Sequence, residues 1–228
     1  MTRSSESNAQ LGVLTARSSK QYDGDETHMN SDNTALILIG YQNDYFAEDG
    51  ILRGAIEESV RTNRILENTD RLLDAVVDTS ITIIDTPIHF TDDYGELINP
   101  VGILKVIKDV GAFKVDTKGS ETIHNIDRLG ARRMTVPGKR GLNAFSNTDL
   151  DMVLSTKRIE NVVLAGAVTS ICIDSTARAA HERGMNVTIL TDCTAARTNF
   201  EQQFYCENIF PLYASPVSSS DFLGSLEG

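Results

Sequence analysis

The chain has little cysteine, little histidine and no long apolar run. Of its 228 residues, only three are cysteine and four are histidine. Three thiols cannot all pair, and no two of them stand in a Cys-x-x-Cys arrangement, so the cysteine usage favours a reducing compartment such as the cytoplasm. The longest apolar runs have only the length of a β-strand, and we therefore expect no membrane-spanning helix.

Basic residues are also scarce. The 21 lysines and arginines face 32 aspartates and glutamates, which gives a formal net charge of -11. A surface of this sign repels polyanions, so we expect binding neither to nucleic acid nor to anionic membranes. The glycine pattern of dinucleotide-binding folds is missing, and the segment 136–141, VPGKRG, lacks the spacing of a P-loop.

The first 33 residues differ in composition from the rest. They are rich in serine, end in an acidic DGDE run and hold few core-forming side chains, so residues 1–33 are predicted to be a flexible arm. Arg3, Arg17 and the serines would also fit an organelle transit peptide, although a disordered or partner-covering arm is favoured; no apolar core of a secretory signal is present. Residues 34–228 are long enough for one α/β domain.

Strand and helix patterns alternate from residue 35 onward. Apolar and β-branched runs predict strands at residues 35–39, 81–84, 133–136, 162–164 and 186–190. Helical spacing predicts helices at residues 61–78, 102–110, from about 150, from 172 and at 200–206, followed by a short last strand and a Ser/Gly-rich tail. The connection between residues 86 and 133 is long enough to carry function. This order predicts a three-layer α/β/α fold with a central, mostly parallel sheet.

The segment 162–178, VVLAGAVTSICIDSTAR, carries the clearest chemical signal. A buried strand is followed by small residues at 165–167, where we expect a sharp turn, and then by Cys172 at the start of a helix. Open α/β sheets bind ligands at the carboxyl ends of their strands, where Cys172 is expected. A helix N-terminus favours the thiolate form of a cysteine and offers N–H groups to an oxyanion. The alternative is a small buried residue, since free cysteine is often buried.

Three motifs, in order and correctly spaced, make this sequence similar to the isochorismatase-like cysteine hydrolases, the family of nicotinamidases, N-carbamoylsarcosine and ureidoacrylate amidohydrolases, and isochorismatases. They are residues 35–46, ALILIGYQNDYF; residues 136–145, VPGKRGLNAF; and residues 166–172, GAVTSIC. The resemblance covers most of residues 34–218 and implies the same three-layer fold.

The resemblance also implies roles for individual residues. Cys172 matches the catalytic cysteine and Lys139 the catalytic lysine. The backbone N–H groups of Val168 and Cys172 correspond to the oxyanion hole, and the peptide bond between Ala167 and Val168 is expected to be cis. Read without the family, Lys139 would be an ordinary exposed lysine.

One position departs from the family. Where relatives carry the aspartate that moves protons, this chain has Gly40. Three explanations remain open. Another acid could serve, with Asp92 or Asp93 preferred over Asp44 and Glu48, since Asp44 is expected to cap backbone amides. The substrate or a water could carry the proton. The protein could also be a catalytically impaired or non-catalytic relative.

The resemblance places Tyr45 and His89 in the substrate pocket, whereas Gln42 and Asn43 are expected to fix the turn. Some nicotinamidases hold a divalent ion near the position of His89. Such sites need several imidazoles, and the other histidines of this chain lie in unrelated segments. We therefore predict no metal and no other cofactor.

The function expected from the resemblance is hydrolysis of a small amide, carbamoyl or ureido C–N bond through a thioester on Cys172. An isochorismatase-type cleavage of a vinyl ether is the enzymatic alternative, but it needs the acid that is missing at Gly40. The partners expected are a small-molecule substrate and further copies of the chain, as a dimer or tetramer.

Overall fold

The central sheet of the computed structural model is entirely parallel. The structure describes residues 29–226, and within them six strands form one sheet in the order β3-β2-β1-β4-β5-β6. The strands are Thr34–Ile39 (β1), Thr82–Thr86 (β2), Arg133–Thr135 (β3), Asn161–Ala167 (β4), Asn186–Ala195 (β5) and Ser215–Val217 (β6). The predicted fold class is confirmed.

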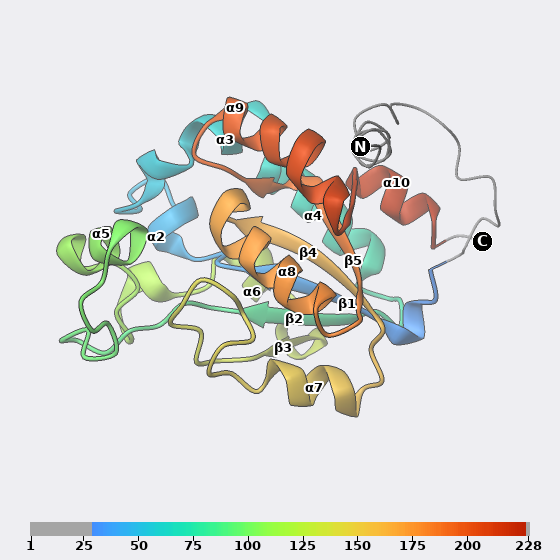
Figure 1. Ribbon diagram of the computed structural model, residues 1–228, viewed down its shortest axis with the longest axis horizontal. Helices are drawn as coiled ribbons and strands as arrows, with labels where there is room; N and C mark the ends of the chain where they lie inside the picture. Colours follow the sequence, from blue (N-terminus) through green and yellow to red (C-terminus); the bar gives the residue numbers. More distant parts are fainter. Residues whose placement is uncertain (1–28, 227–228) are drawn as a thin grey trace, which may run out of the picture.

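Helices cover both faces of this sheet. They are Asn43–Phe46 (α2), Glu57–Thr62 (α3), Ile65–Val76 (α4), Gly102–Val110 (α5), His124–Asp127 (α6), Leu150–Thr156 (α7), Asp174–His181 (α8), Asn199–Phe204 (α9) and Ser219–Gly224 (α10). Figure 1 shows α8 in front of the strands and α4 behind them.

The buried strand β1 divides the core into two layers. Leu36 and Leu38 pack with α4 and with Phe222 of α10. Ala35, Ile37 and Ile39 point to the other face, where they pack with α7 and α8. Successive side chains of a strand point to opposite faces, so a central parallel strand must be apolar throughout, as β1 is.

The strand order reverses direction between β1 and β4. From β1 the chain moves outward to β2 and β3, and it then returns to place β4 on the other side of β1. In open α/β sheets, loops diverge at such a switch point and leave a crevice outside the carboxyl ends of the two strands. Here the residues that follow those ends are Gly40 and Val168.

Three predicted elements need correction. The predicted helix 61–78 is two helices, α3 and α4, because Arg64 between them has a left-handed backbone with φ 52°. Residues 165–167, expected in a turn, belong to β4, whose small residues allow close packing on β1. The predicted tail contains α10, because the Ser218 side chain accepts a hydrogen bond from the Asp221 N–H and Phe222 is buried.

The predicted arm lies mostly outside the described residues. Of its last part, Met29 donates a backbone hydrogen bond to the Ser225 carbonyl at 3.1 Å, and Ser31–Asn33 form a 3-10 turn before β1. No helix within residues 29–226 is both long and apolar enough to cross a lipid bilayer.

Gly166 sets how closely β4 approaches β1. Its φ is +128°, and a Cβ built on it would lie 1.9 Å from the carbonyl oxygen of Ile39. We predict that Gly166→Ala lowers the free energy of unfolding by about 3 kcal/mol or more, because neither buried strand can move aside. Urea denaturation measures this loss.

Gly54→Ala is the matched control, since a Cβ at Gly54 would meet no atom within 4 Å. The control should unfold like the wild type. If Gly166→Ala does so too, the close approach of the two strands does not constrain this position.

Candidate active site

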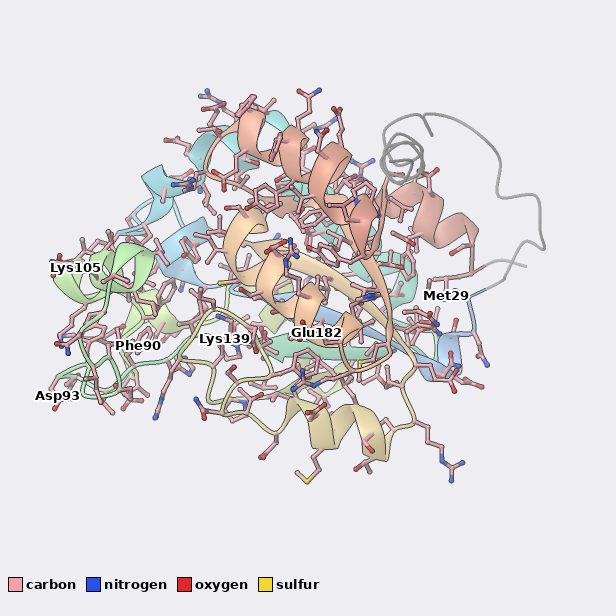
Figure 2. The ribbon with its side chains drawn as sticks, in the orientation of Figure 1. Met29, Phe90, Asp93, Lys105, Lys139 and Glu182 are labelled. Atoms are coloured by element: carbon pink, nitrogen blue, oxygen red, sulfur yellow. The ribbon has the colours of Figure 1, made fainter. Side chains whose placement is uncertain are left out.

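The thiol of Cys172 and the ammonium of Lys139 meet at the switch point. Lys139 Nζ lies 3.5 Å from Cys172 Sγ and 2.8 Å from the carbonyl oxygen of Gly141. The lysine is 0% exposed and the cysteine 5% exposed, so the ammonium is shielded while the sulfur keeps a small opening. A buried cation at this distance stabilises negative charge on the sulfur. Figure 2 shows Lys139 near the centre of the molecule.

Cys172 lies in a π-helical turn, Thr169–Ile173, that leads into α8. The peptide bond from Ala167 to Val168, at the end of β4, is cis, as expected from the resemblance. The Val168 carbonyl then accepts hydrogen bonds from the N–H groups of Ile171 and Ile173, at 3.0 and 3.2 Å. The helix predicted to start at Cys172 thus begins slightly earlier, with a π turn. Such turns are frequent at functional sites.

Helix α9 anchors this turn. Thr169 Oγ1 donates to Gln202 Oε1 at 2.6 Å, and the Ser170 hydroxyl donates to Glu201. The Gln202 amide in turn donates to the Thr191 carbonyl at 2.8 Å and to Thr194 Oγ1 at 3.0 Å. These polar contacts tie the turn that carries the sulfur to the carboxyl end of β5. Sequence patterns do not reveal them, because the partners are about 30 residues apart in the chain.

Two neighbouring segments hold Lys139. Its backbone pairs with the chain after β2: Lys139 forms an isolated parallel bridge with Ile88, and its carbonyl accepts the His89 N–H at 3.3 Å. Further along, the Ala144 N–H donates to Thr176 Oγ1 of α8 at 3.0 Å. The lysine loop is therefore attached to the same helix that Cys172 precedes.

Gly40 lies at the centre of the site with φ +67°. The atoms nearest to a Cβ built there are the Ala167 carbonyl oxygen at 3.1 Å, Ile88 Cδ1 at 3.7 Å and Tyr45 Cδ2 at 3.9 Å. None of these three atoms belongs to a carboxylate. The three nearest contacts are thus one backbone carbonyl, one aliphatic carbon and one carbon of a tyrosine ring.

The acids considered as substitutes lie elsewhere. Asp92 and Asp93 are exposed, and Asp93 accepts hydrogen bonds from Thr91 Oγ1 and the Gly95 N–H. In Figure 2, Asp93 lies at the outer end of the long connection, well away from Lys139. Glu48 is exposed as well. The preference for Asp92 or Asp93 therefore has no support in this structure.

Asp44 binds a backbone amide, as expected. Its Oδ2 accepts the Phe113 N–H at 2.6 Å, and burial raises the pKa of this carboxyl. The two preceding residues bind the long connection as well. Gln42 exchanges hydrogen bonds with the backbone of Ile88 and donates to the Ser120 carbonyl. Asn43 donates to the Lys118 carbonyl at 2.8 Å. The QND turn thus fastens the connection over the sheet edge.

The side chain of Tyr45 lies beside Gly40, whereas the side chain of His89 points away from Gly40. Tyr45 is 1% exposed, and its ring packs beside Phe113 with centroids 5.0 Å apart. In the extended segment that follows β2, Ile88 faces Gly40, and the next side chain, His89, consequently points to the other side. The His89 ring binds the Ser120 carbonyl at 3.2 Å. Ile88 is the pocket residue that the sequence analysis missed, although alternation along the extended segment could have indicated it.

The two cavities found do not contain the thiol. His89 lines a cavity of about 450 Å³ with Arg133, which pairs with buried Asp85 at 2.7 Å. A larger cavity of about 810 Å³ opens at the amino ends of the strands. There the Asn186 side chain donates to Asn161, and the Asn161 side chain donates to Asn33. We place the chemistry at the cysteine and lysine pair, because it unites a nucleophile with a cation.

The remaining thiols are of a different kind. Burial raises the pKa of both Cys193 and Cys206 to about 12, so they stay protonated at neutral pH. Within residues 29–226, no cluster of three or more His, Cys, Asp or Glu side chains is arranged to hold a metal ion.

The comparisons with known proteins agree with the motifs. The model of the isochorismatase domain matches residues 34–221. The isochorismatase family protein YecD of Escherichia coli O157:H7 is 35% identical over 88 residues, which are 39% of this chain and 47% of that protein. This match thus spans about half the length of that relative. The ureidoacrylate amidohydrolase RutB of Agrobacterium fabrum is 25% identical over 203 residues, 84% of this chain and 89% of RutB.

Among solved structures, a cysteine hydrolase from Pseudomonas syringae pv. phaseolicola superposes with a TM-score of 0.75 at 20% identity. The superposition covers 88% of this chain and 95% of that one, which supports the fold. Because the domain model spans most of the sequence, from β1 into α10, the protein belongs to the isochorismatase family of hydrolases.

Proposed function

We propose that the protein hydrolyses a small amide, carbamoyl or ureido C–N bond, with Cys172 as the nucleophile. The observation that carries this proposal is the 3.5 Å contact between the Lys139 ammonium and the Cys172 sulfur, at the sheet edge where ligands bind. The similarity to an amidohydrolase over most of both chains supports the choice of bond.

The proposed reaction has two stages. The thiolate attacks the carbonyl carbon, a C–S bond forms, and the N–H groups of Val168 and Cys172 receive the oxyanion. Breaking the C–N bond leaves a thioester and releases the nitrogen, which takes up a proton. Water then cleaves the thioester and frees the sulfur. The Lys139 ammonium, 3.5 Å from the sulfur, stabilises negative charge on the sulfur during attack and departure.

Two observations bear on the alternative reaction, vinyl-ether hydrolysis, and on the location of the protein. Vinyl-ether hydrolysis in the family uses a carboxylic acid, and none of the three atoms nearest to a Cβ at Gly40 belongs to a carboxylate. The chemistry needs a reduced thiol, and the three cysteines are unpaired, which is consistent with the cytoplasmic location that we expect.

A homo-oligomer, dimer or tetramer, belongs to this proposal. Phe200 of α9 is 79% exposed, and Ile98 and Val101 before α5 are 84% and 80% exposed. Side chains of this kind commonly mark contact surfaces. We expect multi-angle light scattering to give at least twice the monomer mass of 25.0 kDa. A single species at the monomer mass would contradict this part.

The first catalytic prediction concerns thiol reactivity. At pH 7, iodoacetamide should alkylate the thiol of Cys172 much faster than it alkylates the thiol of glutathione. Peptide mass spectrometry should find Cys193 and Cys206 unmodified, because the pKa values of their thiols are about 12. Lys139→Met should slow alkylation of Cys172 by about 10- to 1000-fold, since the nearby cation is lost.

Lys157→Met, which removes an exposed lysine, should leave the rate unchanged. Alkylation of Cys172 no faster than that of glutathione would remove the basis of the hydrolase proposal.

The second prediction identifies the substrate class. Wild-type protein incubated with a panel of amides, carbamoyl compounds and ureides should show a mass increase on Cys172 that decays as product appears. Cys172→Ala should form neither adduct nor product. Turnover that persists in Cys172→Ala would assign the chemistry to another residue.

A further inference from the structure

If the protein acts as proposed above, the leaving nitrogen needs a proton, and a group of the site must supply it. Hydrolysis of an amide requires a group that gives this proton and later takes one from water. The glycine at position 40 cannot do so, and the exposed acids of the long connection do not reach the site. The side chain that borders Gly40 is Tyr45.

Within residues 29–226, the Tyr45 hydroxyl forms no hydrogen bond. Among residues 29–226, the other two buried tyrosines use theirs: Tyr41 donates to the Cys193 carbonyl at 2.9 Å, and Tyr94 donates to the Ala112 carbonyl at 2.6 Å. For Tyr45, no hydrogen bond of the hydroxyl is found among the described residues, and the hydroxyl is not among their solvent-inaccessible unpartnered atoms. The small exposed fraction of this side chain therefore includes the hydroxyl, which is free to bind a ligand.

The position of the ring also fits. Its Cδ2 lies 3.9 Å from where a Cβ of residue 40 would stand, and the Ala167 carbonyl lies 3.1 Å from that same point. The ring thus borders the space that a side chain at position 40 would enter. The carbonyl group of Ala167, the residue before Val168, borders the same space. Packing against Phe113 fixes its orientation.

The charges nearby keep the phenol protonated before attack. Burial raises the pKa of Tyr45 most, and interaction with Cys172 and Asp44 raises it further. Acylation removes the charge of Cys172, because a thioester is neutral, while the Lys139 ammonium remains. A negative charge on the Tyr45 oxygen therefore costs the least free energy once Cys172 is acylated, which is the stage at which the phenolate forms.

We propose that the Tyr45 hydroxyl carries the proton that the absent carboxylate would carry. As the C–N bond breaks, the O–H proton passes to the leaving nitrogen, and the amine departs from the thioester. The phenolate then takes a proton from water, the hydroxide formed attacks the thioester carbon, and the C–S bond breaks. The acid product and the Cys172 thiolate are released, and Tyr45 is again protonated.

The test compares p-nitrophenyl acetate, whose leaving group needs no proton, with p-nitroacetanilide, whose leaving nitrogen needs one. Intact mass spectrometry follows formation of the acetyl adduct on Cys172 from each compound. In Tyr45→Phe, which keeps the ring, we expect acetylation by the ester at the wild-type rate and acetylation by the anilide slowed by about 10²- to 10⁴-fold. Circular dichroism checks that the fold is kept.

Tyr94→Phe is the matched control, because it removes a phenol that is already bonded to a backbone carbonyl. Its adduct should form at the wild-type rate from both compounds. Acetylation of Tyr45→Phe by the anilide at the wild-type rate, or equal slowing with the ester and the anilide, would overturn the role of Tyr45 as proton carrier. A wild type that forms no adduct on Cys172 would instead overturn the proposed function itself, and this inference with it.

Discussion

The contact between a buried ammonium and a sulfur atom is the interaction on which the rest of the site depends. Removing a lysine from water is costly, and the structure offsets the cost with the Gly141 carbonyl at 2.8 Å and the Cys172 sulfur at 3.5 Å. The arrangement is useful only if the two side chains come from segments that cannot drift apart. The lysine loop is therefore bonded both to the chain after β2 and to α8.

The parallel sheet supplies the rigid frame for this contact. The strands β1 and β4 lie side by side at the point where the order reverses, so that their carboxyl ends open into one crevice. Gly166 allows the close approach of the two strands. The cis bond and the π turn that follow β4 then place Cys172 over the edge, and Thr169 and Ser170 are held by α9.

The resemblance places a carboxylate at the position of Gly40, and the neighbours of Gly40 include a residue that we propose takes its part. The backbone of Gly40 is left-handed, and its surroundings are a carbonyl, an aliphatic side chain and the edge of a tyrosine ring. A phenol and a carboxylate both transfer protons, but a phenol also binds apolar surface. Replacing one by the other would make the pocket less polar and leave more room at position 40.

The sequence by itself determined the fold class and the family, and it pointed to the cysteine and lysine that we propose as the reactive pair. Buried strands appear in the sequence as apolar runs. The motifs around Gly40, Lys139 and Cys172 each lie within a short stretch of the chain, so that residue spacing is enough to identify them. Only the tertiary structure decided which side chains meet across those stretches. It paired the His89 ring with the Ser120 carbonyl, placed Ile88 and the ring of Tyr45 beside Gly40, and left Asp92 and Asp93 exposed. The physical reason is that side-chain direction in an irregular connection follows from hydrogen bonds to distant residues, such as those of Gln42 with Ile88 and Ser120, and local patterns carry no record of them.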